Sequence, residues 1–526
     1  MAFANFFDRT ATAASQVLTD FNLESYRASL SAHLIGVHLD DAAATSAEGR
    51  ATLDLCVRIL SRLYPAIAIG GVGSEAQAFI RELKSLALAI NDRIDLPSDT
   101  ARSSVAIVVG NTDMAGDMVK IFAGSDGWRA LVSQKGPVGS GATANPFGAG
   151  AAACFATANV FRSIFADQLT CGGLDPRIDV SMFDYGQAGA AGPSLPEQID
   201  LGDAYLAGLG AIGHGAVWGL RRLPGLSGTL HAVDHDRVDL SNLQRYVMAL
   251  QKDVGRPKSR LARGLLKRDG LRVPGHPMKW SEFVASRKKR TFDRVAVALD
   301  SAPDRIALQA SLPRWIVNAW TQETDLGISR HGFGDGKACL ACLYMPTGVV
   351  KSEDEKVAEE LRLPDAKQEV RELLQKNEGV SENFVQRVAT AFAVRYADLQ
   401  PFVGQPLRNF YQKAICGGLM IALTGSGNPG AAIVPMAFQS ALAGLALAAD
   451  LVKHASGLPV PSATSTRINL LRPLAAVLAD PHARDASGRC ICSDQDFLDA
   501  YRGKYALTAP VRKHGNRRSK GVEIRS

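Results

Sequence analysis

The feature that most constrains the fold of this chain is an apolar run that ends in a glycine-rich turn. Residues 204–207 are apolar, and Gly208-Leu-Gly210-Ala-Ile-Gly213 follows directly. The first two glycines permit a tight turn that lets backbone amides approach a phosphate, and the third lets a helix pack closely on the strand. The next apolar run ends at Asp234, where an acid can accept hydrogen bonds from both hydroxyl groups of a ribose. This arrangement predicts a nucleotide site.

The segments around this turn predict an α/β fold. A helical pattern covers 212–222, and strand-like runs cover 229–233, 294–299 and 315–319. Strands that alternate with helices at this spacing form a doubly wound, mostly parallel, Rossmann-like sheet, which gathers ligands at the carboxyl ends of its strands. Asp300 follows one of these runs and suits a Mg²⁺ ligand, although it could instead cap the helix that comes next.

At 526 residues the chain is too long for one ordinary core, so several domains are expected. We expect a first domain, a linker rich in Gly, Ala and Pro, a glycine-turn domain interrupted by a charged helical insertion, and a basic tail. The expected bounds are 1–190 for the first domain, 196–349 and 416–495 for the two parts of the glycine-turn domain, 350–415 for the insertion and 496–526 for the tail.

Two distant segments share a pattern. Residues 139–150 and 425–432 both contain Gly-Ser-Gly and Asn-Pro, and each leads into an apolar helix. The two domains are therefore predicted to be related copies, of which only the second carries the nucleotide residues. Polar residues interrupt the apolar stretch 430–449, which favours a buried helix over a membrane span.

Four polar residues after the second strand distinguish this site from that of a dehydrogenase. Asp236, Asn242, Arg245 and Lys258 follow within one turn-and-helix region. Arginine offers a planar fork for phosphate oxygens, and lysine offers a point charge. An enzyme that transfers a hydride needs no such set, so a site that attacks ATP is favoured.

The chain resembles the ubiquitin-activating superfamily, which includes ThiF, MoeB and the activating enzymes of ubiquitin-like proteins. The matching motifs are Gly-x-Gly-x-x-Gly, Asp-x-Asp-x-Val-Asp-x-Ser-Asn-Leu-x-Arg, Gly-x-Pro-Lys and a later Ala-Leu-Asp, over roughly 195–495. The resemblance implies one ribose ligand, three ligands of the ATP phosphates and one ligand of Mg²⁺, which are Asp234, then Asn242, Arg245 and Lys258, then Asp300.

The resemblance also gives meaning to the other segments. The first domain is similar to the inactive adenylation half of a ubiquitin-activating enzyme, joined to the active half in one chain. The insertion is closer to the catalytic-cysteine region of those enzymes than to the compact ThiF and MoeB pattern. Tyr246 departs from the Gln that usually follows the Arg. Arg9 and Arg27 are candidates for an arginine that reaches ATP from the first domain.

Four of the eight cysteines form two close pairs. Cys339-Leu-Ala-Cys342 and Cys490-Ile-Cys492 together offer four thiolates, which suits one tetrahedral structural Zn²⁺, with a redox pair as the alternative. The run Cys-x-x-Cys-Leu-Tyr-Met-Pro also resembles the family's zinc knuckle. The isolated cysteines in small or apolar surroundings are predicted to be buried: Cys56, Cys154 and Cys171.

Cys416 lies outside both pairs and outside any apolar run. Two glycines follow it, and the nearby Lys413 favours its thiolate. The family places a catalytic cysteine before such a small-residue loop and helix, so the resemblance makes Cys416 the nucleophile. A buried inert thiol is the alternative.

These residues predict ATP-dependent activation of a ubiquitin-like protein. Its carboxyl terminus would be adenylated, form a thioester on Cys416, and pass to a ubiquitin-conjugating-type enzyme. Bacterial chains of this kind resemble those encoded with conjugation systems in antiviral defence. A sulfur-carrier adenylyltransferase of MoeB or ThiF type is the alternative, and an NAD-dependent oxidoreductase is a distant one.

Charge and composition bear on the other partners. The net charge is +7, and residues 512–526 hold six basic residues against one acidic residue. This tail is interpreted as a solubilising end or as a docking arm for an acidic protein. Nucleic acid is not expected, because no aromatic residues are interleaved with the charges. No signal-type apolar segment opens the chain, so a cytoplasmic location without a membrane partner is expected, and a homodimer stays open.

Overall fold

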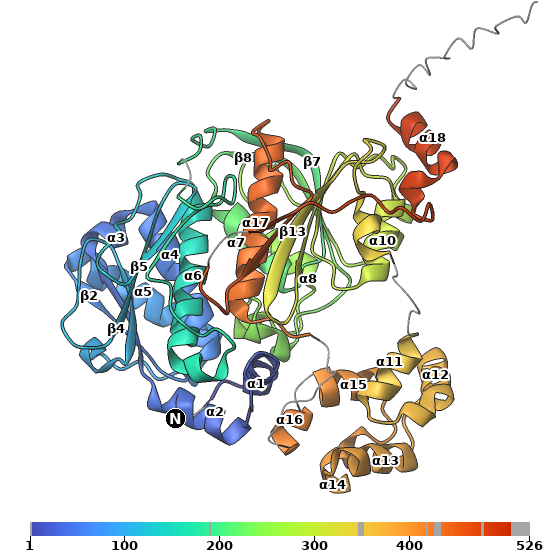
Figure 1. The fold of residues 1–526 in the computed structure, drawn as a ribbon, viewed down its shortest axis with the longest axis horizontal. Coiled ribbons are helices and arrows are strands. Elements are labelled where there is room, and N and C mark those ends of the chain that lie inside the picture. Colours follow the sequence, from blue (N-terminus) through green and yellow to red (C-terminus); the bar gives the residue numbers. More distant parts are fainter. Residues whose placement is uncertain are drawn as a thin grey trace, which may run out of the picture.

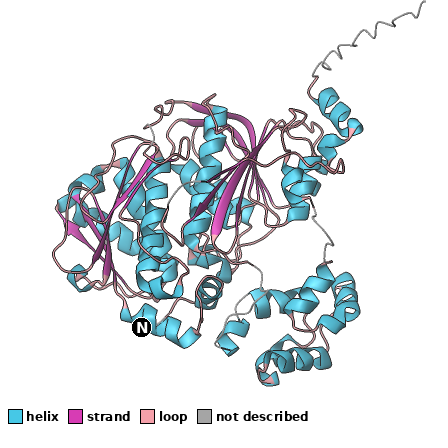
Figure 2. Ribbon diagram, in the orientation of Figure 1, coloured by secondary structure: helices cyan, strands magenta, loops and turns pink. Residues whose placement is uncertain are grey.

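The computed structural model places two α/β domains side by side, with long helices between their sheets and a separate helical body beside the second domain (Figure 1, Figure 2). Parallel strand pairs dominate both sheets, as the sequence predicts. The structure describes residues 3–188, 191–345, 352–416, 419–424, 433–474 and 478–506, except for the side chains at 415–416 and 421–423.

The first domain is a six-stranded sheet with helices on both faces. Its strand order is β2-β1-β3-β4-β5-β6. The first four strands are parallel to one another, and β5 is antiparallel to both of its neighbours, β4 and β6. The predicted strand over 105–109 is confirmed as the buried β3. The elements are α1 (Phe7–Ser15), α2 (Leu23–Ala32), β1 (Ile35–Asp40), α3 (Asp41–Thr45), α4 (Ala47–Leu63), β2 (Ile67–Val72), α5 (Ser74–Ile90), β3 (Val105–Val109), β4 (Val119–Asp126), β5 (Arg129–Ser133), α6 (Pro146–Phe165) and β6 (Arg177–Ser181).

The second domain is built on a longer sheet. Its strand order is β10-β8-β7-β11-β12-β13-β14-β15, with β9 paired to β8, and the strands are parallel up to β12. The elements are β7 (Ile199–Ala207), α7 (Ala211–Arg222), β8 (Leu226–Val233), α8 (Lys258–Leu266), β9 (Leu271–Arg272), β10 (Gly275–His276), α9 (Trp280–Ser286), β11 (Arg294–Val297), α10 (Ala302–Ala310), β12 (Trp315–Thr321), β13 (Asp325–His331), α17 (Ala437–Ala455), β14 (Ser465–Asn469), β15 (Leu478–Asp480) and α18 (Gln495–Lys504).

The two sheets repeat one topology. The order β2-β1-β3-β4-β5-β6 in the first domain matches β8-β7-β11-β12-β13-β14 in the second, with the same strand directions. In each domain a long apolar helix, α6 or α17, connects the last two of these strands. This repeat is what the paired Gly-Ser-Gly and Asn-Pro segments predict.

Long helices form the joint between the domains. α6 packs against α4 and α17, and α17 packs against α7 (Figure 1). α7 and α17 can cross closely because Gly444 has no side chain. A Cβ at this position would lie only 2.1 Å from the carbonyl oxygen of Ile212. Among the described residues, the stretch Pro146–Gln168 is long and apolar enough to cross a membrane, but 83% of its apolar window is buried inside the protein, as in a core helix.

The expected insertion is helical and has a hydrophobic core of its own. Phe384, Val388 and Phe410 are among its buried residues. Its elements are α11 (Glu353–Glu360), α12 (Lys367–Lys376), α13 (Glu382–Phe392), α14 (Tyr396–Leu399), α15 (Leu407–Tyr411) and a π-helical segment (Gln412–Cys416). The insertion is expected to end at 415, but its core continues into α16 (Leu419–Thr424), because Met420 packs in the same cluster.

The start of the predicted tail needs a correction. The tail is expected from residue 496, but Gln495–Lys504 forms α18. Tyr501 and Tyr505 of this segment pack into the cluster that contains the paired cysteines, because their rings supply apolar surface to a small core. The basic residues from 512 onward lie outside the described residues.

Candidate nucleotide and cysteine sites

The glycine turn requires glycine for two separate reasons. Gly208 follows β7 with φ +92°, a left-handed conformation, and a Cβ there would lie 2.4 Å from the carbonyl oxygen of Ala298 in the neighbouring strand connection. A Cβ on Gly213 would lie 2.5 Å from the carbonyl oxygen of Gly208. Gly210 directly precedes α7, so the amides of this helix start point at the carboxyl edge of the sheet. Such a helix start is a ready anion site.

Asp234 is positioned by the turn that it faces. Its Oδ2 accepts a hydrogen bond from Leu209 N at 2.7 Å, and its Oδ1 accepts one from Asp236 N at 2.8 Å. Each oxygen keeps a further lone pair for a hydroxyl group. Burial raises the pKa of Asp234, although the positive charge of Lys258 acts in the opposite direction. The sequence did not reveal that this acid also braces the turn.

Lys258 is a buried cation beside the turn. It is 6% exposed, it opens α8, and its Nζ lies 2.8 Å from Oδ2 of Asp236. Burial lowers the pKa of Lys258, but Tyr246, Asp234 and Asp236 outweigh it, so the net pKa lies above its ordinary value. In Asp236 burial raises the pKa, and the charge of Lys258 outweighs it and holds the pKa down. The pair is therefore fully ionised at neutral pH. Asp236, predicted as a nucleotide ligand, engages Lys258 here.

The other two predicted phosphate ligands lie on the 3₁₀ turn Leu240–Gln244 and directly after it. Oδ1 of Asn242 accepts a hydrogen bond from Asp239 N at 3.0 Å, which caps this turn. The guanidinium of Arg245 lies 5.9 Å from the ring centre of Tyr246.

Tyr246 is a site residue that sequence reasoning undervalued. Its hydroxyl group lies 3.5 Å from the position of a Cβ on Gly210, and its ring centre lies 5.4 Å from Nζ of Lys258. The ring of His214 lies 4.6 Å from it. The only sequence signal was its place next to Arg245. Its buried ring packs between the glycine turn and the two cations.

Asp300 lies at the expected edge but does not cap the following helix. It is exposed and lies three residues after the end of β11, beside the strand that leads into the glycine turn. Ser301 caps α10 instead, because its Oγ accepts a hydrogen bond from Asp304 N at 3.2 Å. Arg305 turns inward and donates to the carbonyl oxygen of Leu299 at 3.0 Å. The carboxylate of Asp300 is thus available to a cation at the nucleotide edge.

The equivalent edge of the first domain holds acids. Oδ1 of Asp40, at the end of β1, accepts from Ala43 N at 2.8 Å, and its Oδ2 accepts from Asn111 N at 2.7 Å. Oδ1 of Asp41 accepts from Ala76 N, in the first turn of α5, at 2.8 Å. These carboxylates occupy amides that an anion would need, and their charge repels phosphate.

The first domain contributes α1 to the nucleotide edge of the second. Phe6, just before α1, packs with Leu243 and Tyr246 in one small core. Arg9, on the first turn of α1, is 9% exposed. Arg27, the other predicted candidate, is an exposed residue of α2 that stacks on the first domain's own Phe7 at 5.3 Å. The structure thus packs α1, the helix that carries Arg9, against the turn Leu240–Gln244, whereas Arg27 lies on α2.

The four paired cysteines meet in one buried cluster. Sγ of Cys339 lies 3.8 Å from that of Cys342 and 3.6 Å from that of Cys490, and Sγ of Cys342 lies 3.5 Å from those of Cys490 and Cys492. Zn–S bonds of about 2.3 Å place the corners of a tetrahedron about 3.8 Å apart. Hydrogen bonding from Cys339 lowers the pKa of Cys342 to about 5. The residues therefore fit a closed zinc site.

The other cysteines divide differently from the prediction. Cys56 and Cys154 are buried, as predicted, and burial raises the pKa of each thiol. Cys171 was predicted to be buried as well, but it is exposed, because it lies in the turn that follows α6 and not in the helix. The backbone of Cys416 ends the π-helical segment, and its side chain lies outside the described residues.

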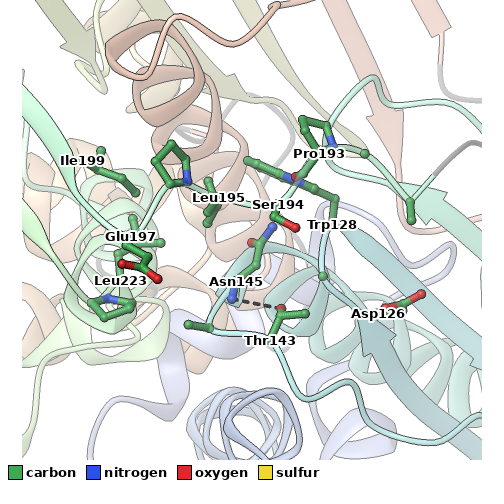
Figure 3. A pocket seen from close by; sticks show the side chains of 16 residues that line it. Asp126, Trp128, Thr143, Asn145, Pro193, Ser194, Leu195, Glu197, Ile199 and Leu223 are labelled. Carbon is green, nitrogen blue, oxygen red and sulfur yellow. Dashed lines mark hydrogen bonds between the residues drawn. The ribbon is translucent and has the colours of Figure 1, made fainter.

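A cavity of about 380 Å³ lies apart from both sites (Figure 3). It is lined by the first domain, by the linker and by the turn between α7 and β8. Nε1 of Trp128 donates to the carbonyl oxygen of Pro193 at 2.8 Å and so fixes the linker on the first domain. The cavity thus belongs to the joint between the domains. Its lining includes Trp128, Asn145, Pro193, Leu195, Ile199 and Leu223.

Comparison with known protein families agrees with the fold of the second domain. Residues 187–475, more than half of the chain, match the ThiF family. The chain belongs to the ThiF family. Residues 38–166, in the first domain, match a family described as Prokaryotic E2 family C. This description differs from the inactive adenylation half that the sequence resemblance implies.

Two curated relatives of this ThiF-family chain differ in how much they share with it. The uncharacterized protein y4jF of Sinorhizobium fredii is 56% identical over 508 residues, which cover 96% of this chain and 98% of that protein. The sulfur carrier protein adenylyltransferase of Thermus thermophilus is 30% identical over 174 residues, or 31% of this chain and 63% of that protein.

Solved structures of E. coli MccB are similar to part of the chain. The structure with MccA-N7isoASN has a TM-score of 0.35 and 15% identity, and covers 55% of this chain and 66% of that one. The structure with ATP has a TM-score of 0.34 and 15% identity, and covers 56% of this chain and 67% of that one.

Proposed function

We propose that this ThiF-family protein is an ATP-dependent enzyme that activates the carboxyl terminus of a ubiquitin-like protein. The observation that carries the proposal is the buried Lys258 beside the glycine turn, ionised and paired with the exposed Asp236, with Asp234 braced on the same turn. A fixed cation that needs no reorganisation stabilises charge that develops on phosphate during reaction. Hydride transfer breaks no bond at phosphorus, so it does not call on a cation in this way.

The first step is adenylation. A carboxylate oxygen of the partner attacks the α-phosphorus of ATP, the bond to the β-phosphate breaks, and pyrophosphate leaves with its electron pair. Arg245 and Lys258 hold the phosphates, and Asp234 holds the ribose. Asp300 and the neighbouring acids suit a Mg²⁺ ion, which would neutralise phosphate charge when bound. The glycine turn supplies backbone amides at the start of α7.

The second step is transfer to sulfur. The thiolate of Cys416 attacks the activated carbonyl carbon, AMP leaves, and a thioester remains. Transfer to a cysteine of a conjugating-type enzyme follows. The position of Cys416 at the end of a π-helical segment supports this role. Such segments are rare in proteins overall, and those that occur are often found at functional sites. The match of residues 38–166 to Prokaryotic E2 family C supports a link to conjugation, and we place the reaction in the cytoplasm of a bacterium, in antiviral defence.

The first domain would serve as an inactive half that completes the active one. In the first domain, Asp40 and Asp41 accept hydrogen bonds from the backbone amides that a bound anion would otherwise use. Its helix α1 packs on the turn Leu240–Gln244 of the second domain. The four-cysteine cluster would hold a structural Zn²⁺, which would tie α18 to the second domain.

A second function shares the adenylation site. A sulfur-carrier adenylyltransferase would need no thioester to a conjugating enzyme, and the Thermus relative bears that name. The two functions differ in the fate of the adenylate, so they are separable by experiment.

The test separates adenylation from thioester formation. Each candidate partner, a small protein with a flexible, glycine-ended tail, is incubated with the enzyme, ATP and Mg²⁺. Wild type should exchange radioactive pyrophosphate into ATP and show a reductant-sensitive adduct by intact mass spectrometry. Cys416→Ala should keep the exchange and lose the adduct, and Cys171→Ala, at an exposed cysteine, should keep both. Exchange without any adduct on wild type would favour the sulfur-carrier function.

A further inference from the structure

The helix α4 of the first domain contacts the backbone that carries the phosphate-binding arginine. Nη2 of Arg62 donates to the carbonyl oxygens at both ends of the segment 246–249, at 2.9 and 2.6 Å. Nη1 of Arg58, one turn earlier, donates to the carbonyl oxygen of Val247 at 3.0 Å. This segment begins directly after Arg245, so its position sets where that guanidinium stands.

The same helix also holds the helix that starts at the glycine turn. Oδ2 of Asp54 accepts hydrogen bonds from Nε1 of Trp218 at 2.8 Å and from Nη2 of Arg222 at 2.5 Å, both on α7. It also accepts one from Nε of Arg58 at 2.8 Å. Three side chains at four-residue spacing on one face of α4 thus fix two walls of the nucleotide site.

Arg62 is a buried charge with an unusual set of partners. It is 2% exposed, and its guanidinium donates to backbone carbonyls; the ion pairs of the described residues include no carboxylate bound to it. Burying a cation without a carboxylate is costly. Burial and the neighbouring Arg58 lower the pKa of Arg62, and the charge of Asp54 acts in the opposite direction. Burial lowers the pKa of His214 to about 3, and the positive charges of Lys258, Arg62 and Arg58 lower it in the same direction. The charges of Lys258 and of the two arginines on α4 therefore act on the same residue of α7.

We propose that Arg62, assisted by Arg58, is a positioning residue through which the first domain sets the phosphate-binding geometry of the second. It acts on ATP through the backbone of 246–249 and through Arg245, without touching the reacting atoms. The inference rests on the proposed function, because it requires ATP at the glycine turn. It gives the first domain a role beyond packing: a helix of one half aligns a cation of the other.

The first measurement needs no turnover. Hydrogen–deuterium exchange is followed in Arg62→Lys without nucleotide, with circular dichroism to establish that the variant folds. We expect faster exchange in 240–250 than in wild type, because lysine cannot bond two carbonyls as a planar fork. Arg50→Lys is the matched control, since Arg50 lies on α4 but pairs with Glu82 of the first domain. Equal exchange in Arg62→Lys and wild type would overturn the inference.

The second measurement is ATP–Mg²⁺ affinity by calorimetry. Arg62→Lys should weaken binding about 10-fold, and Arg50→Lys should leave it unchanged; small misplacements of this kind cost up to about 100-fold. In an Arg245→Ala background the effect of Arg62→Lys should fall below about 2-fold, because coupled residues are non-additive. If Arg62 had a purely structural role, Arg62→Lys would weaken ATP binding about 10-fold in the Arg245→Ala background as well, and that result would refute the positioning role. If Arg62→Lys fails to fold, Arg58→Gln takes its place in both measurements.

The outcomes separate this inference from the proposed function. Wild type that binds ATP but forms no adenylate with any partner would refute the function and leave the positioning role standing. Wild type that forms adenylate, with additive effects of Arg62→Lys and Arg245→Ala, would refute the positioning role alone.

Discussion

Cys490→Ser should remove a zinc ion from the four-cysteine cluster and loosen the C-terminal helix. Sγ of Cys490 lies 3.6 and 3.5 Å from those of Cys339 and Cys342, against about 3.8 Å between the corners of a zinc–thiolate tetrahedron. Each sulfur therefore needs to move by only about 0.2 Å to bind the metal. Because the site is nearly preformed, we expect full occupancy by one zinc ion and a Kd of about 1 nM or below.

The bound metal should stabilise the region that it joins. At free zinc 1,000-fold above the Kd, binding adds about 4 kcal/mol to the folded state. Tyr501 and Tyr505 of the C-terminal segment pack in the same cluster, so loss of zinc should speed hydrogen–deuterium exchange over residues 490–505. Zinc content is measured by plasma mass spectrometry on protein purified without chelator.

The control and the refuting result are both direct. Cys171→Ser removes an exposed thiol outside the cluster and should leave zinc content and exchange unchanged. Wild type without saturable zinc binding, or Cys490→Ser with full zinc occupancy, would refute the structural-zinc reasoning.

Three further predictions concern the joint and the nucleotide site. In Asp54 burial raises the pKa, but Arg222 and Arg58 outweigh it and hold the pKa at about 2 against 3.8, a shift that corresponds to about 2 kcal/mol of stability. This stability is present above about pH 4 and is lost as the pH falls toward 2. Asp54→Asn should therefore have a lower free energy of unfolding at pH 7, and that free energy should change less between pH 4 and pH 2 than in wild type. Urea unfolding followed by tryptophan fluorescence measures both. Lys258→Gln should lower pyrophosphate exchange about 100-fold or more, because it removes a preorganised cation; unchanged exchange would exclude Lys258 from phosphate binding. Arg9→Ala should lower ATP-dependent exchange about 10-fold while Arg27→Ala leaves it intact, and equal effects would contradict the placement of α1.

Local patterns in the sequence predicted the backbone elements that surround the candidate nucleotide site. The strand, glycine turn and helix around Gly208 follow from backbone conformation and apolar periodicity, which depend on neighbouring residues. Asp300 was placed at the correct edge, because strand ends of a parallel sheet share one side. Its alternative role as a helix cap was wrong, since Ser301 takes it. The exposure of Cys171 was missed, because burial depends on what packs over a turn.

The sequence by itself determined the family and the α/β fold, and it supplied the candidate residues of a nucleotide site, because each motif is read within one short segment. Only the tertiary structure decided what those motifs meet. Arg62 and the carbonyl oxygen of Tyr246 are 184 residues apart, and Cys342 and Cys490 are 148 residues apart. Such contacts depend on how two whole domains pack, and no local propensity encodes that packing. The sequence named candidate phosphate ligands, and the fold revealed that α4 of the other domain bonds the backbone beside one of them, Arg245.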